Sequence, residues 1–279
     1  MNTGSDRSSE REVTSISLSV LELLRERPDH DLMKIGRSAA VDTDGVVRIN
    51  FNEELETAEG GLMAEGTQVR RQLHAVLDAL ERRDPALARQ IIADDDRVDD
   101  AHIATETRIM SLLALQAPVA TDLRLIRAMM HTNLHLERMG DLCVNMAKFV
   151  LNEQSYPPDS PMVIRLREMG VRAGEMLDIA LACFASRDLE AAETLPVKDN
   201  AIDRLNRGML DDLRDYVGDE ETFALAVNIV LVSRYLERFA DHSVDIGEQV
   251  SYLVTGVLRE FEDASHPESG IDDADSREL

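Results

Sequence analysis

An internal repeat constrains the fold of this sequence more than any other feature. The block Leu136-Glu137-Arg138-Met139-Gly140-Asp141 is answered one hundred positions later by Leu236-Glu237-Arg238-Phe239-Ala240-Asp241. Upstream, the acid-rich segment 95–99 is answered by segment 199–203. Two pairs of similar blocks in the same order indicate two structurally similar halves. The chain of 279 residues is therefore expected to fold as a tandem repeat.

Each half has the hydrophobic period of three helices, and no segment has the alternation of a strand. Helices are expected at about 51–83, 85–116, 118–154, 161–186, 188–217 and 219–256. The glycines at 60, 61 and 66 are expected to weaken the first helix. Start signals precede four of the six helices, namely Asp84-Pro85, Ser160-Pro161, Asp188 and Asp219. The fold class predicted is all-α, with two tandem three-helix bundles.

The proline-rich segment 156–161 divides the chain into a first bundle at 48–155 and a second at 160–256. Residues 1–47 have no place in the repeat. They are expected to be a poorly ordered extension, which is either a regulatory tail or the product of a start codon assigned too far upstream. Residues 257–279 are rich in acids and are expected to form a disordered tail.

The charge balance excludes several classes of function. Lys and Arg total 30 against 54 Asp and Glu, so the net charge is −24. Binding to nucleic acid needs a basic face, and docking on an anionic lipid surface needs basic segments. The strongly acidic balance therefore argues against both functions. No apolar run is long enough to span a membrane, and the polar segment MNTGSDRSSERE lacks the hydrophobic region of a signal peptide. Cys143 and Cys183 lack metal-site spacing and are expected to be buried thiols of a cytoplasmic protein.

Four pairs of carboxylates recur at i, i+4 spacing, which places both members on one helical face. They are Asp95/Asp99, Glu137/Asp141, Asp199/Asp203 and Glu237/Asp241. A solvated acidic face is the ordinary interpretation of one such pair. Two observations favour a metal site instead. Asp95 and Asp199 fall on otherwise apolar helical stripes, where an unpaired acid is costly, and like charges at i, i+4 repel until a cation relieves them.

Hairpin geometry adds a third observation. Pro118 lies midway between Asp99 and Glu137, and also midway between Asp95 and Asp141. The corresponding midpoint of the second half falls beside the Gly218-Asp219 turn. Antiparallel helices would therefore bring each set of four carboxylates to the same two levels. Such oxygen-rich sites suit Fe, Mn, Mg or Ca better than a structural zinc, which prefers Cys and His.

The core of the chain resembles the PhoU family of regulators of bacterial phosphate uptake. The residues that carry the resemblance are RINFNEEL at 48–55, PVATDLR at 118–124, the LERMGD and LERFAD blocks, and YLVTG at 252–256. The resemblance implies two tandem three-helix bundles related by pseudo-twofold symmetry. It also implies metal clusters on the E/D-x-x-x-D motifs, which match the four pairs above. The identity of the metal (Fe, Mn, Mg or Zn) stays open.

The resemblance further implies a negative regulator of the phosphate-starvation response, and not an enzyme. Its implied partners are the high-affinity phosphate ABC transporter and a phosphate-sensing histidine kinase. The protein is expected to be a cytoplasmic homodimer that reaches the membrane through these partners. The alternative is a ferritin-like di-metal oxidoreductase. That class needs E-x-x-H in both halves, whereas Asp99-x-x-His102 occurs only in the first, where the second has Asn206.

Two further histidines, His131 and His135, lie one turn apart just before the LERMGD block. They are candidate ligands, but the second half has Leu231 and Tyr235 at the same positions. A structural role is therefore favoured for both.

Overall fold

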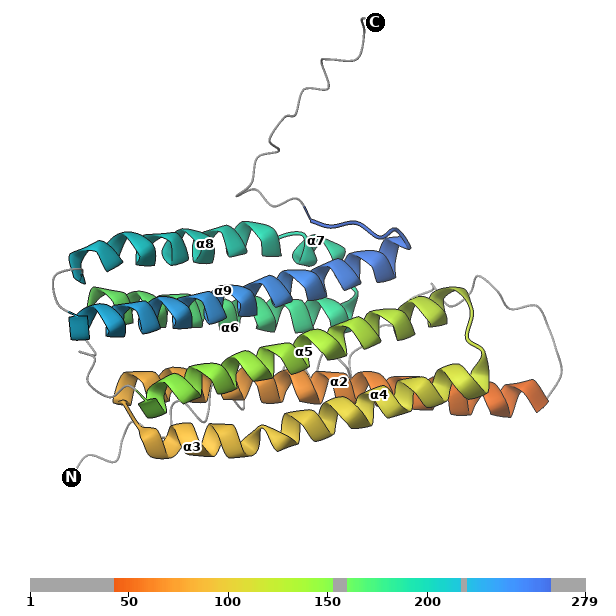
Figure 1. The fold of residues 1–279 in the computed structure, drawn as a ribbon. Helices are drawn as coiled ribbons and strands as arrows, with labels where there is room; N and C mark the ends of the chain where they lie inside the picture. Colours follow the sequence, from red (N-terminus) through yellow and green to blue (C-terminus); the bar gives the residue numbers. More distant parts are fainter. Residues whose placement is uncertain (1–42, 153–159, 217–219, 262–279) are drawn as a thin grey trace, which may run out of the picture.

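The computed structural model describes residues 43–152, 160–216 and 220–261, and these residues form helices without any strand (Figure 1). The elements are α2 (Thr43–Arg82), α3 (Pro85–Asp94), α4 (Asp96–Gln116), α5 (Ala120–Asn152), α6 (Pro161–Ser186), α7 (Leu189–Ala192), α8 (Leu195–Asp212), the 3₁₀ helix η2 (Leu213–Tyr216) and α9 (Glu220–Thr255). The all-α prediction is confirmed. The segments 1–42 and 262–279 lie outside the described residues.

Three of the predicted helix starts are capped as expected. The Asp84 carboxylate accepts from the backbone N–H groups of the first turn of α3, the Ser160 hydroxyl accepts from the N–H of Val163, and Asp188 accepts from the N–H of Ala191. These bonds satisfy N–H groups that have no partner inside the helix. The fourth predicted cap, Asp219, lies outside the described residues.

Two predicted helices are interrupted. The helix expected at 85–116 turns at Asp95, where the N–H of Val98 bonds back to the Asp95 carbonyl at 2.8 Å and tightens the chain. The helix expected at 188–217 is divided into α7, α8 and η2. Helical periodicity did not reveal these breaks, because the residues on either side keep the same apolar face.

The first helix begins at Thr43, inside the segment expected to be an extension, and it runs past its three glycines without a break. Gly66 serves close packing rather than weakening the helix. A Cβ at Gly66 would lie 2.5 Å from Leu181 on α6, and a Cβ at Gly170 on α6 would lie 2.3 Å from Leu77 on α2. The two glycines thus let α2 and α6 approach each other through a reciprocal pair of contacts.

The helices assemble into two bundles that pack along their length (Figure 1). The first bundle contains α2, α3, α4 and α5, and the second contains α6, α7, α8 and α9. Corresponding helices meet at the boundary, α2 against α6 and α5 against α9. Pairing between corresponding helices is what a pseudo-twofold arrangement requires. The predicted pair of tandem bundles is therefore confirmed.

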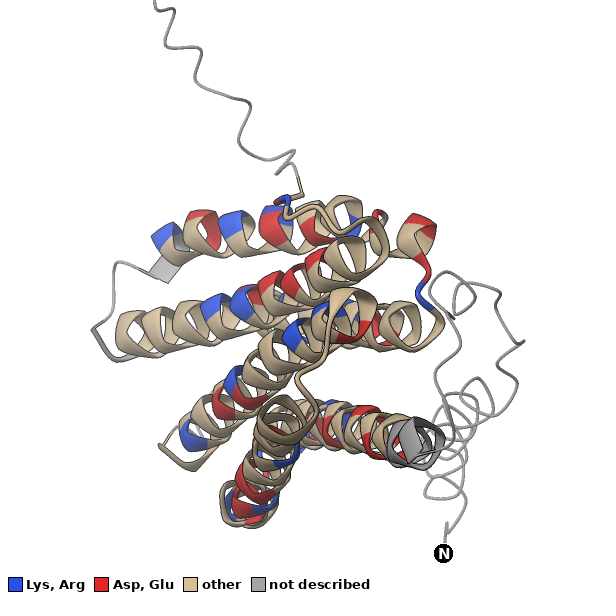
Figure 2. Cartoon of the chain, turned by 90° about the vertical axis from the view of Figure 1, so that its right-hand side faces the viewer, with Lys and Arg blue, Asp and Glu red and all other residues tan. Residues whose placement is uncertain are grey.

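The core is aliphatic and continuous through both bundles, with Leu, Met, Ala and Val filling most of the buried positions. Cys143 and Cys183 are both buried and free. Ion pairs cross the boundary at α2 and α6, including Arg70 with Asp178 at 3.1 Å and Arg187 with the buried Glu59 at 3.0 Å. Figure 2 shows acidic and basic residues interspersed along the helices of both bundles.

The segment after α9 departs from the expected disordered tail. The N–H of Phe261 donates to the Glu248 carboxylate at 2.8 Å, and Arg259 Nε donates to the Ser251 hydroxyl at 3.0 Å. Residues 257–261 therefore fold back along α9. Along the part of the chain that the structure describes, no helix has both the length and the apolar character needed to cross a membrane.

Candidate metal centres

The first carboxylate set comes from three points of the first bundle. Asp95 lies at the junction of α3 and α4, Asp99 lies on the first turn of α4, and Glu137 and Asp141 lie on α5. The charges of Asp99 and Asp141 act on Asp95, and the same two charges act on Glu137. These four side chains therefore lie within electrostatic range of one another. Among the described residues they do not form a group of three ligand atoms within 4.8 Å of one another, so the metal site stays a prediction.

The environment of this site disfavours negative charge when no cation is bound. Burial, followed by the neighbouring acids, raises the pKa of Asp95, although a hydrogen bond at 3.3 Å from the amide of Gln72 opposes the shift. Burial and then the charge of Asp141 raise the pKa of Glu137. A bound cation would favour the charged forms of both groups.

A fifth carboxylate, Glu65 on α2, faces the same site and was missed by the sequence analysis. It is fully buried, and neither of its oxygens has a hydrogen-bond partner among the described residues. Burial, with the charge of Glu137 as a second cause, raises its pKa to about 8. The available signal was its place on the apolar stripe of α2, between Leu62 and Val69.

The glycine of the LERMGD block makes room for this site. A Cβ at Gly140 would lie 3.2 Å from Val98 and 3.7 Å from the Asp95 carboxylate. Glycine therefore lets α5 come close to the turn at Asp95. The close approach places Asp141, the next residue, beside Asp95.

The second carboxylate set is built by α8 and α9. Burial raises the pKa of Asp241 to about 7, and the charges of Glu237 and Asp203 contribute to the shift. Burial also raises the pKa of Glu237, while the guanidinium of Arg234 opposes the shift. Asp199 lies one turn before Asp203, and its Oδ1 is shielded from solvent. Asp203, Glu237 and Asp241 therefore lie within electrostatic range of one another, and their metal binding stays a prediction.

Comparisons with known proteins agree with this architecture. The family model described as "PhoU domain" matches residues 62–150 and 166–250, which is more than half of the chain. The chain belongs to the PhoU family. The phosphate-specific transport system accessory protein PhoU homolog of Synechocystis is 33% identical over 213 residues, covering 75% of this chain and 93% of the relative. The homolog of Pseudomonas aeruginosa is 32% identical over 209 residues, covering 74% and 86%.

Solved PhoU structures share the fold. The crystal structure of PhoU from Pseudomonas aeruginosa has a TM-score of 0.70 at 30% identity, and the comparison covers 74% of this chain and 100% of that one. The phosphate transport system regulatory protein PhoU from Streptococcus pneumoniae has a TM-score of 0.69 at 30% identity, with coverage of 75% and 99%.

His102 and Asn206, the corresponding positions of the two halves, each make a hydrogen bond to the neighbouring helix of the same bundle. His102 Nδ1 lies 2.9 Å from the side-chain nitrogen of Asn133, and the side-chain oxygen of Asn206 accepts from the Ser233 hydroxyl at 2.8 Å. The partners, Asn133 and Ser233, are themselves corresponding residues of α5 and α9. A contact repeated with different chemistry in the two halves indicates a role in helix packing, which disfavours the ferritin-like alternative.

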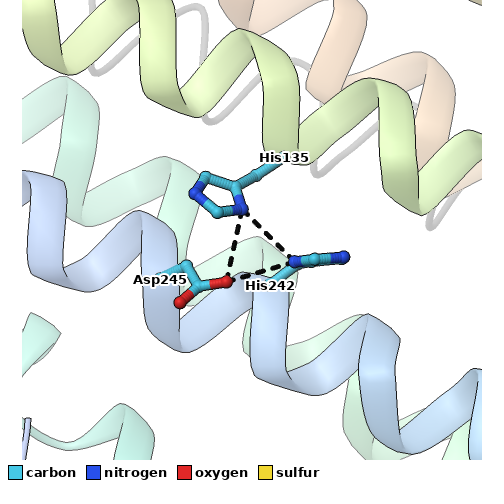
Figure 3. A group of neighbouring side chains, drawn as sticks. All are labelled: His135, His242 and Asp245. Carbon is cyan, nitrogen blue, oxygen red and sulfur yellow. Dashed lines mark hydrogen bonds and ion pairs between the residues drawn. The ribbon is translucent and has the colours of Figure 1, made fainter.

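The histidine pair of the sequence analysis separates in space. His131 is exposed, and burial together with the charge of Arg127 lowers its pKa. His135 turns toward α9, where it contacts His242 and Asp245 (Figure 3). Burial lowers the pKa of His135 to about 4. Sequence spacing does not reveal this group, because His135 lies more than one hundred residues before His242 and Asp245.

Proposed function

We propose that this protein is a negative regulator of the phosphate-starvation response and of high-affinity phosphate uptake. The observation that carries the proposal is its place in the PhoU family, whose relatives are named accessory proteins of the phosphate-specific transport system. In this proposal it acts in the cytoplasm as a homodimeric adaptor between the phosphate ABC transporter and the phosphate-sensing histidine kinase. It binds no nucleic acid, reaches the membrane only through its partners, and is not an enzyme.

The proposal includes metal ions on the two carboxylate sets. Asp95, Asp99, Glu137 and Asp141 would hold metal in the first bundle, and Asp199, Asp203, Glu237 and Asp241 in the second. Carboxylates within electrostatic range of one another, with pKa values raised by burial and then by these charges at Asp95, Glu137, Glu237 and Asp241, support this assignment. A bound ion would neutralise the repulsion and tie together helices of one bundle. The oxygen donors suit Fe, Mn or Mg, and Zn is a further candidate.

Complementation of a deletion strain tests the regulatory role. Loss of the gene should leave phosphate-starvation genes expressed in phosphate-rich medium, and the wild-type chain should restore repression. The double variant Asp141→Asn, Asp241→Asn removes one charge from each carboxylate set and should fail to restore it. Asp100→Asn changes an exposed acid outside both sets and serves as the matched control.

Normal repression in a deletion strain that has no second member of the family would contradict the regulatory role. Equal repression by the double variant and by Asp100→Asn would show that repression does not depend on the carboxylate sets. Co-purification from phosphate-replete cells, with the transporter and the kinase as the two proteins sought, tests the adaptor role in the same strains.

A further inference from the structure

Three metal-ligating side chains meet at the boundary between the two bundles, and none of them belongs to either carboxylate set. The second set is nearby, because the charges of Asp245 and His242 act on Asp241. His135 comes from α5, and His242 and Asp245 come from successive turns of α9 (Figure 3). The Nδ1 atoms of the two histidines are 3.2 Å apart. Asp245 Oδ2 lies 3.3 Å from His135 Nδ1 and 3.1 Å from His242 Nδ1.

These three distances match those between neighbouring ligand atoms around a bound metal ion. Zinc binds imidazole nitrogen and carboxylate oxygen at about 2.0–2.2 Å. Two ligand atoms at that distance from a tetrahedral ion are therefore about 3.3–3.5 Å apart, and they are about 3 Å apart around an octahedral ion. The three atoms already stand at such distances, so an ion could bind to one side of their plane with only small movements of the side chains.

Hydrogen bonding alone leaves this group of atoms incompletely satisfied. A neutral imidazole carries one N–H, and the Asp245 carboxylate only accepts. If His242 Nδ1–H donates to Asp245, its hydrogen points away from His135 Nδ1. If His135 Nδ1–H donates to Asp245 instead, His242 Nδ1 lacks a donor. If both rings carry the proton on Nδ1, both can donate to the carboxylate, but the buried His242 Nε2 then has no hydrogen-bond partner among the described residues. Both rings are largely removed from water, with their side chains 13% and 11% exposed. An ion to one side of their plane would use one lone pair from each of the three atoms.

We propose that His135 Nδ1, His242 Nδ1 and Asp245 Oδ2 bind one first-row transition-metal ion, such as Zn²⁺, which links α5 to α9 and thereby the first bundle to the second. Two imidazoles and one carboxylate are a ligand set typical of such ions. The Asp245 side chain is 39% exposed, so water can reach the ion and complete its coordination.

The internal repeat restricts the site to one copy per chain. The positions related to His135, His242 and Asp245 by the repeat are occupied by Tyr235, Leu142 and Asn145. Leucine offers no ligand atom, and neutral tyrosine and asparagine are weak substitutes. The ion would therefore bind on one side of the pseudo-twofold axis only, and this asymmetry distinguishes it from the carboxylate sets, which occur in both bundles.

Zinc titration of the full chain tests the proposal. The parent is the Asp141→Asn, Asp241→Asn variant, which weakens the carboxylate sets so that the new site is measured separately. Isothermal titration calorimetry should show one Zn²⁺ per chain, and Zn²⁺ should raise the melting temperature. His135→Gln and Asp245→Asn, each added to the parent, should weaken Zn²⁺ binding at least tenfold and abolish the thermal shift. His131→Gln, on the exposed histidine one turn away, should leave both unchanged.

Asp245→Asn guards against misfolding, because Asn145 already occupies the related position on α5. Failure of the parent to bind Zn²⁺ would overturn the proposal, as would equal Zn²⁺ affinity in His131→Gln, His135→Gln and Asp245→Asn. The proposal stands independently of metal at the carboxylate sets, since a wild-type chain that binds a single Zn²⁺ lost in Asp245→Asn would support this site alone.

Discussion

The two carboxylate sites share one scaffold but differ in what their first helix contributes. The sequences of α2 and α6 align through pairs such as Leu62/Leu166 and Gly66/Gly170. In this alignment Met169 is the residue equivalent to Glu65, and Met176 is the residue equivalent to Gln72. Glu65 and Gln72 present a carboxyl and an amide to the first site. Both methionines are buried in the core of the second bundle.

The two halves therefore share their helices and paired acids but differ in the residues that the first helix contributes to each site. The first site can draw ligands from α2, the α3–α4 turn, α4 and α5. The second draws its carboxylates from α8 and α9 alone. We expect the first site to bind metal more tightly, because it has an additional buried carboxylate, and to be the less stable of the two without metal.

Exchanging the differing residues should produce the largest effect. In chelator at pH 7, Glu65→Met should raise the free energy of unfolding by on the order of 3 kcal/mol. The wild-type side chain must remain protonated in the folded state, where its pKa is about 8 against the usual 4.5. The methionine at the equivalent position of α6 is fully buried, so the volume is tolerated. Chemical denaturation measures the change.

The pH dependence of this gain checks its origin. Because the folded pKa of Glu65 lies above the unfolded one, its contribution is fully present below about pH 4.5 and is lost as the pH rises towards about 8. The gain from Glu65→Met should therefore shrink as the pH falls to 4.5. The reverse exchange, Met169→Glu, should destabilise the second bundle. A gain that does not change with pH would show that Glu65 is not the titrating group.

Metal removal should have the next largest effect. Binding to the folded state stabilises by about 2.7 kcal/mol when free metal is one hundred times Kd. Wild type should lose this amount in chelator, whereas the double variant Asp141→Asn, Asp241→Asn should change little. Each single variant should lower metal content in its own bundle, as measured by elemental analysis after desalting. Equal metal content in wild type and the double variant would contradict metal binding by the carboxylate sets.

The smallest effect should come from the packing position shared by His102 and Asn206. His102→Asn places the residue of the second bundle in the first and removes the contact with Asn133. We expect a loss of about 1 kcal/mol in stability, typical of one hydrogen bond, and unchanged metal content. Ser233→Ala, which removes the bond to Asn206, is the matched change in the second bundle. Loss of metal in His102→Asn would revive the ferritin-like interpretation.

Local patterns predicted much of the fold and of the sites. Caps at Asp84, Ser160 and Asp188 follow from chemistry within a few residues of each helix start. The convergence of Glu137 with Asp99 follows from helical spacing and the position of one turn. Such features depend on contacts within a helix or between neighbours in a hairpin, where sequence distance sets spatial distance.

The sequence by itself determined the helical repeat, its division into two halves and the places where paired acids meet. Only the tertiary structure decided what lies across from these elements. Glu65 lies at the first site because α2 packs against α4 and α5. His135 contacts Asp245 because α5 packs against α9. Hydrophobic periodicity shows which face of a helix is buried, but many partner helices can bury the same face. The choice among them rests on side-chain fit, as at Gly66 and Leu181, which no local spacing records.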